Sequence, residues 1–188
     1  KISKNGDNLN SWTHVADTHD GNHSLNQTNY TFLNESKYIA GRSYDTSASV
    51  IKGILAKFNS DYTQVLNYSN YFYEAYTHLG PIIVENKKLI CGFTKIKTSG
   101  KVYFSLVKMD TLGNIIWEKN FINHKHLVNI DIHSVLKLPD NGYLLQSYEY
   151  HQYLHYGQET DSGISLLIKV DSIGNEIWRK RIGSLKTR

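Results

Sequence analysis

Residues 105–119 read S-L-V-K-M-D-T-L-G-N-I-I-W-E-K, and residues 165–180 read S-L-L-I-K-V-D-S-I-G-N-E-I-W-R-K. Each stretch is an apolar run with a lysine, followed by an aspartate, a Gly-Asn turn and a second run that reaches Trp117 or Trp178. Short runs that are rich in β-branched residues and closed by a glycine turn are typical of paired antiparallel strands. The unit therefore predicts an all-β chain.

The same order of blocks recurs along the chain. The lysine that precedes the turn has counterparts at Lys1, Lys57, Lys108 and Lys169, and the last three follow a second shared block. That block reads F-L-N-E-S-K-Y-I-A-G, then I-V-E-N-K-K-L-I-C-G, then V-L-K-L-P-D-N-G-Y-L-L-Q-S. Two blocks in one order, three times over, indicate a repeated structural unit.

Each unit is predicted to hold four short strands. In the first unit they fall near residues 29–33, 37–44, 50–58 and 63–67. In the second unit they fall near 81–85, 88–95, 101–110 and 114–120. In the third unit they fall at 133–138, 143–149 and 164–171, with a fourth ending near Arg181. A polar loop through Gly157 to Gly163 separates the second and third strands of this last unit.

Four short antiparallel strands at this period are typical of a β-propeller blade. We expect one propeller segment, in which a partial blade ends at 1–12, three blades occupy 13–67, 68–120 and 121–181, and residues 182–188 begin the next connection. Closed propellers have about four to eight blades, so a longer chain is expected. The tryptophan of the fourth strand is expected to cover the joint between neighbouring blades.

Two of these blocks also carry a resemblance. H-S-V-L-K-L-P-D-N-G-Y-L-L-Q-S and S-L-L-I-K-V-D-S-I-G-N-E-I-W-R-K resemble the repeats of large secreted or surface β-propeller proteins common in Bacteroidota. They are similar as well to the tryptophan-docking repeats of quinoprotein-like propellers, with Asp171, Gly174 and Trp178 in the matching roles. The resemblance implies a scaffold fold at the cell envelope, the cell surface or outside the cell, and no particular chemistry.

Composition narrows the classes of partner. The 21 basic residues are scattered, whereas a nucleic-acid interface needs them clustered, so no nucleic-acid partner is expected. No apolar run reaches the ~18 residues that span a bilayer, so no membrane insertion is expected in this segment. The single cysteine, Cys91, lies in an apolar strand and is expected to be a buried, inert thiol.

Aromatic and histidine side chains are the candidate binding residues. Tyrosines and histidines crowd one loop within the third unit, and two further histidines fall in connections between units. The candidates are Tyr148, Tyr150, His151, Tyr153, His155, Tyr156, His78 and His133. Amphipathic rings of this kind suit a protein interface or the stacking of a sugar, and packing against a neighbouring blade explains them equally well.

No metal, cofactor or catalytic site is assigned. His14, His19, His23, His124 and His126 join His78 and His133 in the predicted connections, but their spacing matches no ligand signature, and plain polar roles are favoured over zinc. The turns at Asp110 and Asp171 offer too few oxygens for calcium, which favours a turn in which the aspartate caps backbone amides.

The sequence thus favours a non-catalytic scaffold that binds proteins at a bacterial cell envelope. The alternatives are a carbohydrate-binding module that uses the Tyr148–Tyr156 loop and a glycan-active enzyme. For the enzyme, Glu74, Glu149, Glu159 and Asp161 are available as carboxylates, but the sequence does not place any pair at a catalytic separation.

Overall fold

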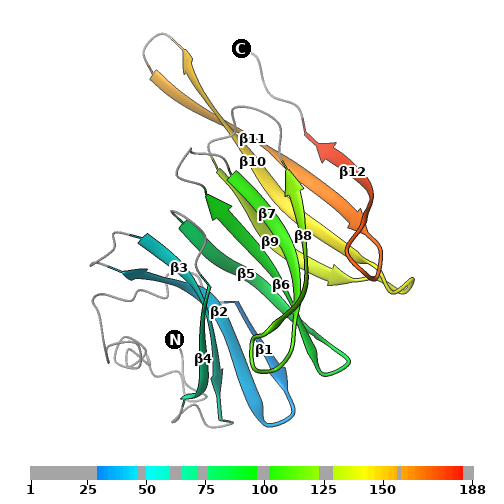
Figure 1. Ribbon diagram of the computed structural model, residues 1–188. Coiled ribbons are helices and arrows are strands. Elements are labelled where there is room, and N and C mark those ends of the chain that lie inside the picture. Colours follow the sequence, from blue (N-terminus) through cyan, green and yellow to red (C-terminus); the bar gives the residue numbers. More distant parts are fainter. Residues whose placement is uncertain are drawn as a thin grey trace, which may run out of the picture.

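The computed structural model describes residues 29–45, 50–59, 65–71, 76–96, 102–122, 129–155 and 158–183, and these form antiparallel β-sheets (Figure 1). Sheet 1 consists of β1 (Asn29–Leu33), β2 (Ser36–Asp45), β3 (Val50–Phe58) and β4 (Val65–Tyr71). Sheet 2 consists of β5 (Tyr76–Glu85), β6 (Lys88–Ile96), β7 (Val102–Met109) and β8 (Ile115–Ile122). Sheet 3 consists of β9 (Asn129–Lys137), β10 (Tyr143–His155), β11 (Gln158–Val170) and β12 (Glu176–Ile182).

Every sheet has the same connectivity. Within each one, a strand pairs antiparallel with the strand that follows it in the chain, so that the order is that of a simple meander. A single parallel bridge between Ile51 and Tyr76 links sheets 1 and 2 into one hydrogen-bonded set of eight strands. The all-β, antiparallel prediction is confirmed.

Tight turns close the first hairpin of each sheet. Asn34, Asn86, Lys87 and Asn141 all adopt positive φ, between 47° and 66°. Asparagine tolerates this left-handed region better than other residues that have a side chain, and it is the conformation needed in two-residue hairpins such as Asn86-Lys87 and at the last position of the three-residue turn at 139–141. The register of the strands is therefore set locally by the asparagines of these turns.

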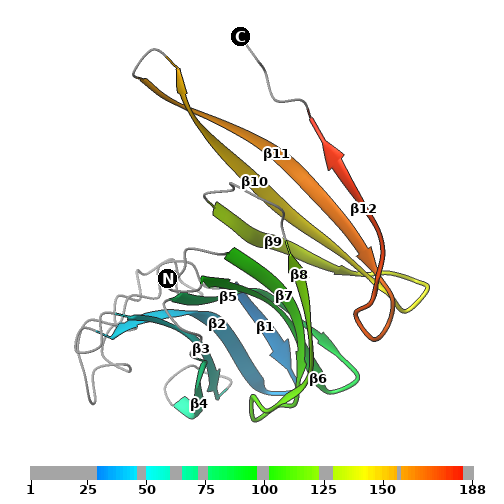
Figure 2. The ribbon, with the colours of Figure 1, turned by 45° about the horizontal axis from the view of Figure 1, so that its top comes forward.

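The sheets pack face to face in chain order (Figure 2). One apolar cluster joins sheets 1 and 2 and contains Tyr38, Leu55, Leu89, Phe93 and Met109, among others. A second joins sheets 2 and 3 through Ile90, Phe104, Leu106, Tyr143 and Ile168, among others. A meander of four strands leaves both of its faces wet, so burial of these side chains requires the neighbouring sheet.

The first strand of each sheet makes the contact with the sheet before it. β5 lies against β1, β2 and β3, and β9 lies in the same way against β5, β6 and β7. Glycines permit the close approach: a Cβ at Gly53 would meet the side chain of Leu79, and one at Gly92 would meet Ile132. The two joints are thus built to the same plan.

Two predicted boundaries are wrong at the start of a sheet. β5 begins at Tyr76 rather than near residue 81, because Pro81 lies within the strand at a register shift between Leu79 and Ile82. A proline has no amide to donate and is accommodated where the ladder is interrupted. β9 likewise begins at Asn129 rather than at residue 133.

The predicted loop through Gly157 to Gly163 is also wrong. β10 and β11 each run for 13 residues and pair continuously from Tyr143–Val170 to His155–Gln158. Their far ends extend past β9 and β12 as a two-stranded arm (Figures 1 and 2). The residues read as a loop are therefore mostly paired backbone.

Candidate interaction surface

The Asp-x-x-Gly-Asn turns before β8 and β12 have one geometry. Asp110 Oδ1 accepts hydrogen bonds from the amides of Leu112 (2.8 Å) and Asn114 (2.9 Å). Asp171 Oδ1 accepts the equivalent bonds from Ile173 (3.0 Å) and Asn175 (2.8 Å). In both turns the second carboxylate oxygen accepts from the asparagine side chain. The prediction that aspartate caps its own turn is confirmed, and both of its oxygens are engaged within the turn.

Each of these turns sits on the fourth strand of the preceding sheet. Gly113, with φ of 89°, lies so close to Ser69 and Tyr71 of β4 that an added Cβ would meet both side chains at 2.6 Å. Tyr71 Oη donates to the Gly113 carbonyl oxygen over 2.5 Å. Gly174, with φ of 84°, lies in the same way on Trp117 and Lys119 of β8. Only glycine meets both requirements, positive φ and close approach.

Trp117 therefore covers the joint between sheets 2 and 3, as predicted. Its ring is half-buried and packs against the apolar cluster that the two sheets share. The ring also forms the surface on which the Gly174 turn rests, because a Cβ at that glycine would meet two of its ring carbons at 2.8 and 3.0 Å.

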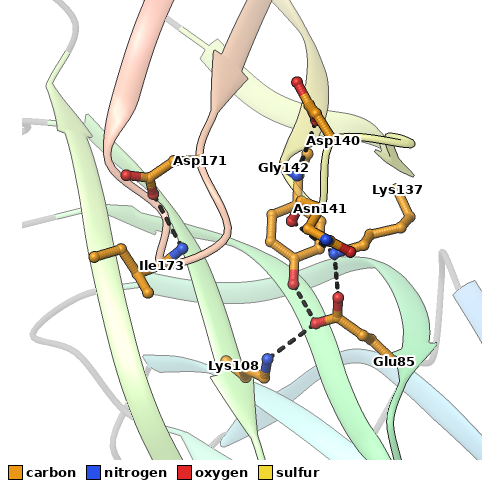
Figure 3. A network of polar contacts seen from close by, with 9 residues as sticks. Glu85, Lys108, Lys137, Asp140, Asn141, Gly142, Asp171 and Ile173 are labelled. Carbon is orange, nitrogen blue, oxygen red and sulfur yellow. Dashed lines mark hydrogen bonds and ion pairs between the residues drawn. The ribbon is translucent and has the colours of Figure 1, made fainter.

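A polar network closes the same joint at the end of β5 (Figure 3). Glu85 of sheet 2 accepts from Lys108 Nζ (2.9 Å) of its own sheet, and also from Lys137 and Tyr143 of sheet 3. Burial by itself raises the pKa of the Glu85 carboxyl, but the hydrogen bonds from Lys137, Tyr143 and Lys108 outweigh it and lower the pKa to about 2. The carboxylate is held charged, and its role is to join two sheets.

The face of sheet 3 that points away from sheet 2 presents apolar side chains to solvent. We call it the outer face of sheet 3. Leu136 is 56% exposed, Trp178 is 42% exposed and Ile182 is 50% exposed. Leu144 and Leu167 lie on the same face, which strand alternation separates from the buried Tyr143, Leu145, Leu166 and Ile168. Every residue of β12 is exposed.

Two of the predicted binding residues meet on this face. The rings of His133 and Tyr148 are in edge-to-face contact, with centroids 6.5 Å apart. His133 lies in β9 and is exposed, and Tyr148 lies in β10 and is half-buried. In the register, Tyr148 is opposite Ser165, and Ser165 is opposite Ile182. The aromatic pair therefore borders the apolar positions of the outer face.

The other predicted residues are distributed differently from the expectation. His78 lies in β5 and His133 in β9, so neither belongs to a connection between sheets, because both strands begin earlier than predicted. Tyr150, His151, Tyr153 and His155 lie in β10, within or next to the two-stranded arm rather than in a loop. Glu149 is in β10, and Glu159 and Asp161 are in β11. Outside the described residues lie His14, His19, His23, Glu74, His124, His126 and Tyr156.

Other polar side chains of sheet 2 bond to one another, whereas Thr77 Oγ1 in β5 is buried without a hydrogen-bond partner among the described residues. Lys95 Nζ is 2.5 Å from Glu118 Oε1, and Ser105 Oγ lies 3.0 Å from the same oxygen and 2.6 Å from Asn120 Oδ1. Cys91 is fully buried, and burial raises the pKa of its thiol, which confirms the expectation of an inert side chain. These groups stabilise sheet 2 from within.

The described ranges contain no group of three or more histidine, cysteine, aspartate or glutamate side chains that could hold a metal ion. Within the same ranges, no helix has the length and apolar character needed to traverse a bilayer.

Sequence reasoning missed the residues that matter most at this surface. Glu85 was placed only at the end of the predicted strand 81–85, because its partners Lys108, Lys137 and Tyr143 lie 23, 52 and 58 residues away in the sequence. Leu136 and Leu144 fell within predicted strands with no face assigned, and Ile182 fell just past the predicted end of the last strand. Trp178 matches Trp117 in its sequence context, so the residues themselves do not mark which of the two is exposed.

A scan against models of known protein families finds no match to the chain, and a search of curated proteins finds none either.

Proposed function

We propose that the chain is a segment of a β-propeller-type stack of sheets that serves as a non-catalytic scaffold for binding proteins. The observation that carries the proposal is the outer face of sheet 3. On sheet 2 the equivalent positions are covered by sheet 3. On sheet 3 itself, Leu136, Trp178 and Ile182 are exposed to solvent. Exposed apolar side chains gathered on one sheet face are typical of a protein-binding surface.

The propeller part of the proposal is supported by the plan of the sheets. The meanders are identical in connectivity, their first strands contact one another in chain order, and each joint repeats the seat of a glycine turn. Sheets that repeat one packing step in this way are arranged around a common axis, with their first strands nearest to it. Negative-stain images of the longest natural polypeptide that contains these residues would test it: a closed ring supports the propeller, and an open stack contradicts it.

A non-catalytic role is supported by the state of the polar groups. Glu85, Glu118, Asp110 and Asp171 are all engaged with donors of the chain itself. Location at a bacterial envelope rests on the resemblance of the sequence blocks, and fractionation of cells that express the protein would test it.

The binding test uses the full chain immobilised against an extract of bacterial envelopes. A captured protein is identified by mass spectrometry, purified and titrated against three forms: wild type, Trp178→Glu with Ile182→Glu, and the control Leu112→Glu with Ile116→Glu, whose side chains are exposed on sheet 2. We expect the outer-face variant to lose at least about tenfold in affinity and the control to lose little. Equal affinity of all three forms would show that this face is not the binding site.

A carbohydrate-binding role is the second candidate, and the His133–Tyr148 pair favours it. An exposed imidazole edge-on to a half-buried phenol provides an amphipathic ring surface of the kind that stacks on sugars. A glycan array decides between the candidates: binding that is lost in Tyr148→Ala and kept in Tyr30→Ala supports the module. Hydrolysis of a polysaccharide panel, lost in Glu149→Gln or Glu159→Gln, would instead support an enzyme.

A further inference from the structure

The outer face of sheet 3 can be compared with the equivalent faces of sheets 1 and 2. Lys57, Lys108 and Lys169 occupy one register position, opposite Tyr38, Ile90 and Leu144 respectively. Along the same face, Leu55, Leu106 and Leu167 are equivalent, and so are Tyr71, Phe121 and Ile182. In sheets 1 and 2 these positions are filled by residues that the next sheet helps to bury. Sheet 3 has the same pattern, and no other sheet of the described residues covers it.

The seat for a glycine turn is also present on sheet 3. Trp117 and Trp178 both lie opposite the register lysine, and Lys119 and Lys180 lie two residues further along the same strand. At the joint of sheets 2 and 3, Trp117 and Lys119 receive the turn of Gly174. Trp178 and Lys180 therefore form a seat of the same composition on β12.

The two joints differ at one position. It is the last residue of each sheet's first strand, and its side chain points toward the next sheet. In sheet 1 it is Leu33, which packs with Val84 against a cluster that contains Leu89. In sheet 2 it is Glu85, which binds Lys137 and Tyr143. The register makes Lys137 and Tyr143 the counterparts of Val84 and Leu89. An apolar residue thus meets an apolar pair, and a carboxylate meets a lysine and a tyrosine.

In sheet 3 the residue at this position is Leu138, which follows Lys137 and pairs with Gly142 at the start of the hairpin turn. Because Lys137 points to sheet 2, strand alternation places Leu138 on the opposite side, toward the outer face. Leu138 matches Leu33 and not Glu85. The outer face of sheet 3 is therefore of the apolar type seen between sheets 1 and 2.

We propose that the outer face of sheet 3 docks one further four-stranded sheet of this build, and that Leu138 selects its identity. The incoming sheet places the glycine of an Asp-x-x-Gly-Asn turn on Trp178 and Lys180. It places apolar side chains, like Val84 and Leu89 and unlike Lys137 and Tyr143, against Leu138. This inference rests on the proposed scaffold function and names the class of partner that the scaffold takes at this face.

A second copy of this chain fits the surface less well. In a second copy the matching face is that of sheet 1, where Phe32 and Lys37 occupy the positions of Val84 and Leu89, and where Ile39, Ala56 and Phe58 are already buried. Lys37 is a buried charged residue whose ammonium lies over the rings of Tyr30 and Phe32, so docking would place a charge against the apolar Leu138. Residues 59–64 of sheet 1 read N-S-D-Y-T-Q, which contains no glycine for the seat on Trp178.

The test extends the full chain at its C-terminus with a duplicate of one of its own sheets. One form carries a second copy of residues 76–122, which brings the Val84 and Leu89 pair. The other carries a second copy of residues 129–183, which brings Lys137 and Tyr143. Residues 184–188 serve as the connection in both. The readout is the rate of amide hydrogen exchange in the peptide that covers residues 176–182, which docking slows.

We expect the 76–122 extension to slow this exchange at least about tenfold and the 129–183 extension to slow it less. Leu138→Glu should reverse the preference, because the new carboxylate meets the duplicate lysine and tyrosine. Replacing the duplicate's turn glycine, which corresponds to Gly113, with valine should abolish the effect. Gln146→Ala should strengthen it, since Gln146 stands where sheet 2 has Gly92 and sheet 1 has Ala40.

Three outcomes would overturn the inference. Neither extension slows the exchange, or both do so equally and Leu138→Glu changes nothing, or the unextended chain forms a dimer in which β12 is protected. A foreign protein that binds the outer face in the capture experiment, with no docking of either extension, would overturn this inference and leave the scaffold function standing. If no foreign protein is captured but an extension still docks, the scaffold function is overturned and this inference stands.

Discussion

The strands β8 and β12 are near-copies in sequence and opposites in environment. Both begin after the same capped turn, both carry a tryptophan opposite a lysine, and both form the fourth strand of a meander. Trp117 on β8 is half-buried beneath the Gly174 turn, whereas Trp178 on β12 is 42% exposed. The difference lies in the neighbour, since sheet 3 covers β8.

Both strands therefore carry side chains that suit contact with another sheet better than contact with solvent. A tryptophan on an exposed edge gains little from its size, and a row of apolar residues on a free sheet is a hazard for aggregation. The same residues become stabilising once a sheet covers them, at about 1.5–3 kcal/mol for each large side chain that is fully buried. The predictions below test whether cover alone separates the two strands.

The largest difference is expected between the two tryptophans. Trp117→Ala should lower the free energy of unfolding by about 3 kcal/mol, since it removes a large side chain from the joint and leaves a cavity beneath the Gly174 turn. Trp178→Ala should lower it by less than about 1 kcal/mol, because its ring has no covering turn. Urea unfolding of the two variants measures both values. Equal losses would mean that the joint does not depend on Trp117.

The next effect concerns the residues that end the first strands. Glu85→Gln should destabilise the fold by about 2 kcal/mol, because Lys108 and Lys137 lose their partner in a half-buried site. The partial exposure of both lysines keeps the loss below that of a fully buried pair. The matched change Leu138→Gln should alter stability by less than about 0.5 kcal/mol. Thermal unfolding at neutral pH compares them, and a larger loss for Leu138→Gln would reverse the assignment of covered and open faces.

Lowering the pH should weaken the Glu85 network gradually, without a substitution. The pKa of Glu85 is lowered from 4.5 to about 2 in the folded state, so its contribution is complete above about pH 4.5 and is lost as the pH falls toward 2. The unfolding free energy of the wild type should fall across this window more steeply than that of Glu85→Gln. Parallel pH profiles of the two proteins would show that the Glu85 network contributes nothing to stability.

The smallest effect is expected at the joint between sheets 1 and 2. Tyr71→Phe removes the hydroxyl that donates to the Gly113 carbonyl oxygen and should destabilise by about 1 kcal/mol. Tyr30→Phe, at a side chain of β1 that is 59% exposed, is the control and should change stability by a few tenths of that amount. An equal effect of the two changes would show that the turn does not depend on this bond.

Most of the architecture could be predicted because the signals are local. Asparagine and glycine turns mark the hairpins, and alternation marks the strands between them, so the twelve strands of the described residues were anticipated, most of them with shifted ends, whereas the partial blade predicted at 1–12 lies outside these residues. The errors arose at proline and glycine residues, which occur both at the ends of strands and within them. Pro81 was read as a strand start, although it lies at a bulge, and Gly157 and Gly163 were read as the borders of a loop, although Gly163 pairs with Tyr150 in the arm.

The interaction surface was harder to predict, because exposure depends on which sheet lies next to which. Trp178 and Trp117 are indistinguishable in the sequence, and only packing shows that one is covered. The contact of His133 with Tyr148 depends on the register between β9 and β10, which shifts between Gln146 and Ser147. A register shift of this kind has no clear mark in the residues themselves.

The glycine that rests on the preceding sheet has a consequence for how such a chain can grow. Among the described residues, each of the two apolar joints is formed by the two sheets that meet there, so lengthening the chain by one duplicated sheet leaves the earlier joints untouched. Duplication of the gene segment that encodes one sheet adds the new sheet and also a surface on which the following sheet can pack. Divergence then has to change only the few residues at the rim of the contact, as the exchange of a leucine for a glutamate between positions 33 and 85 illustrates.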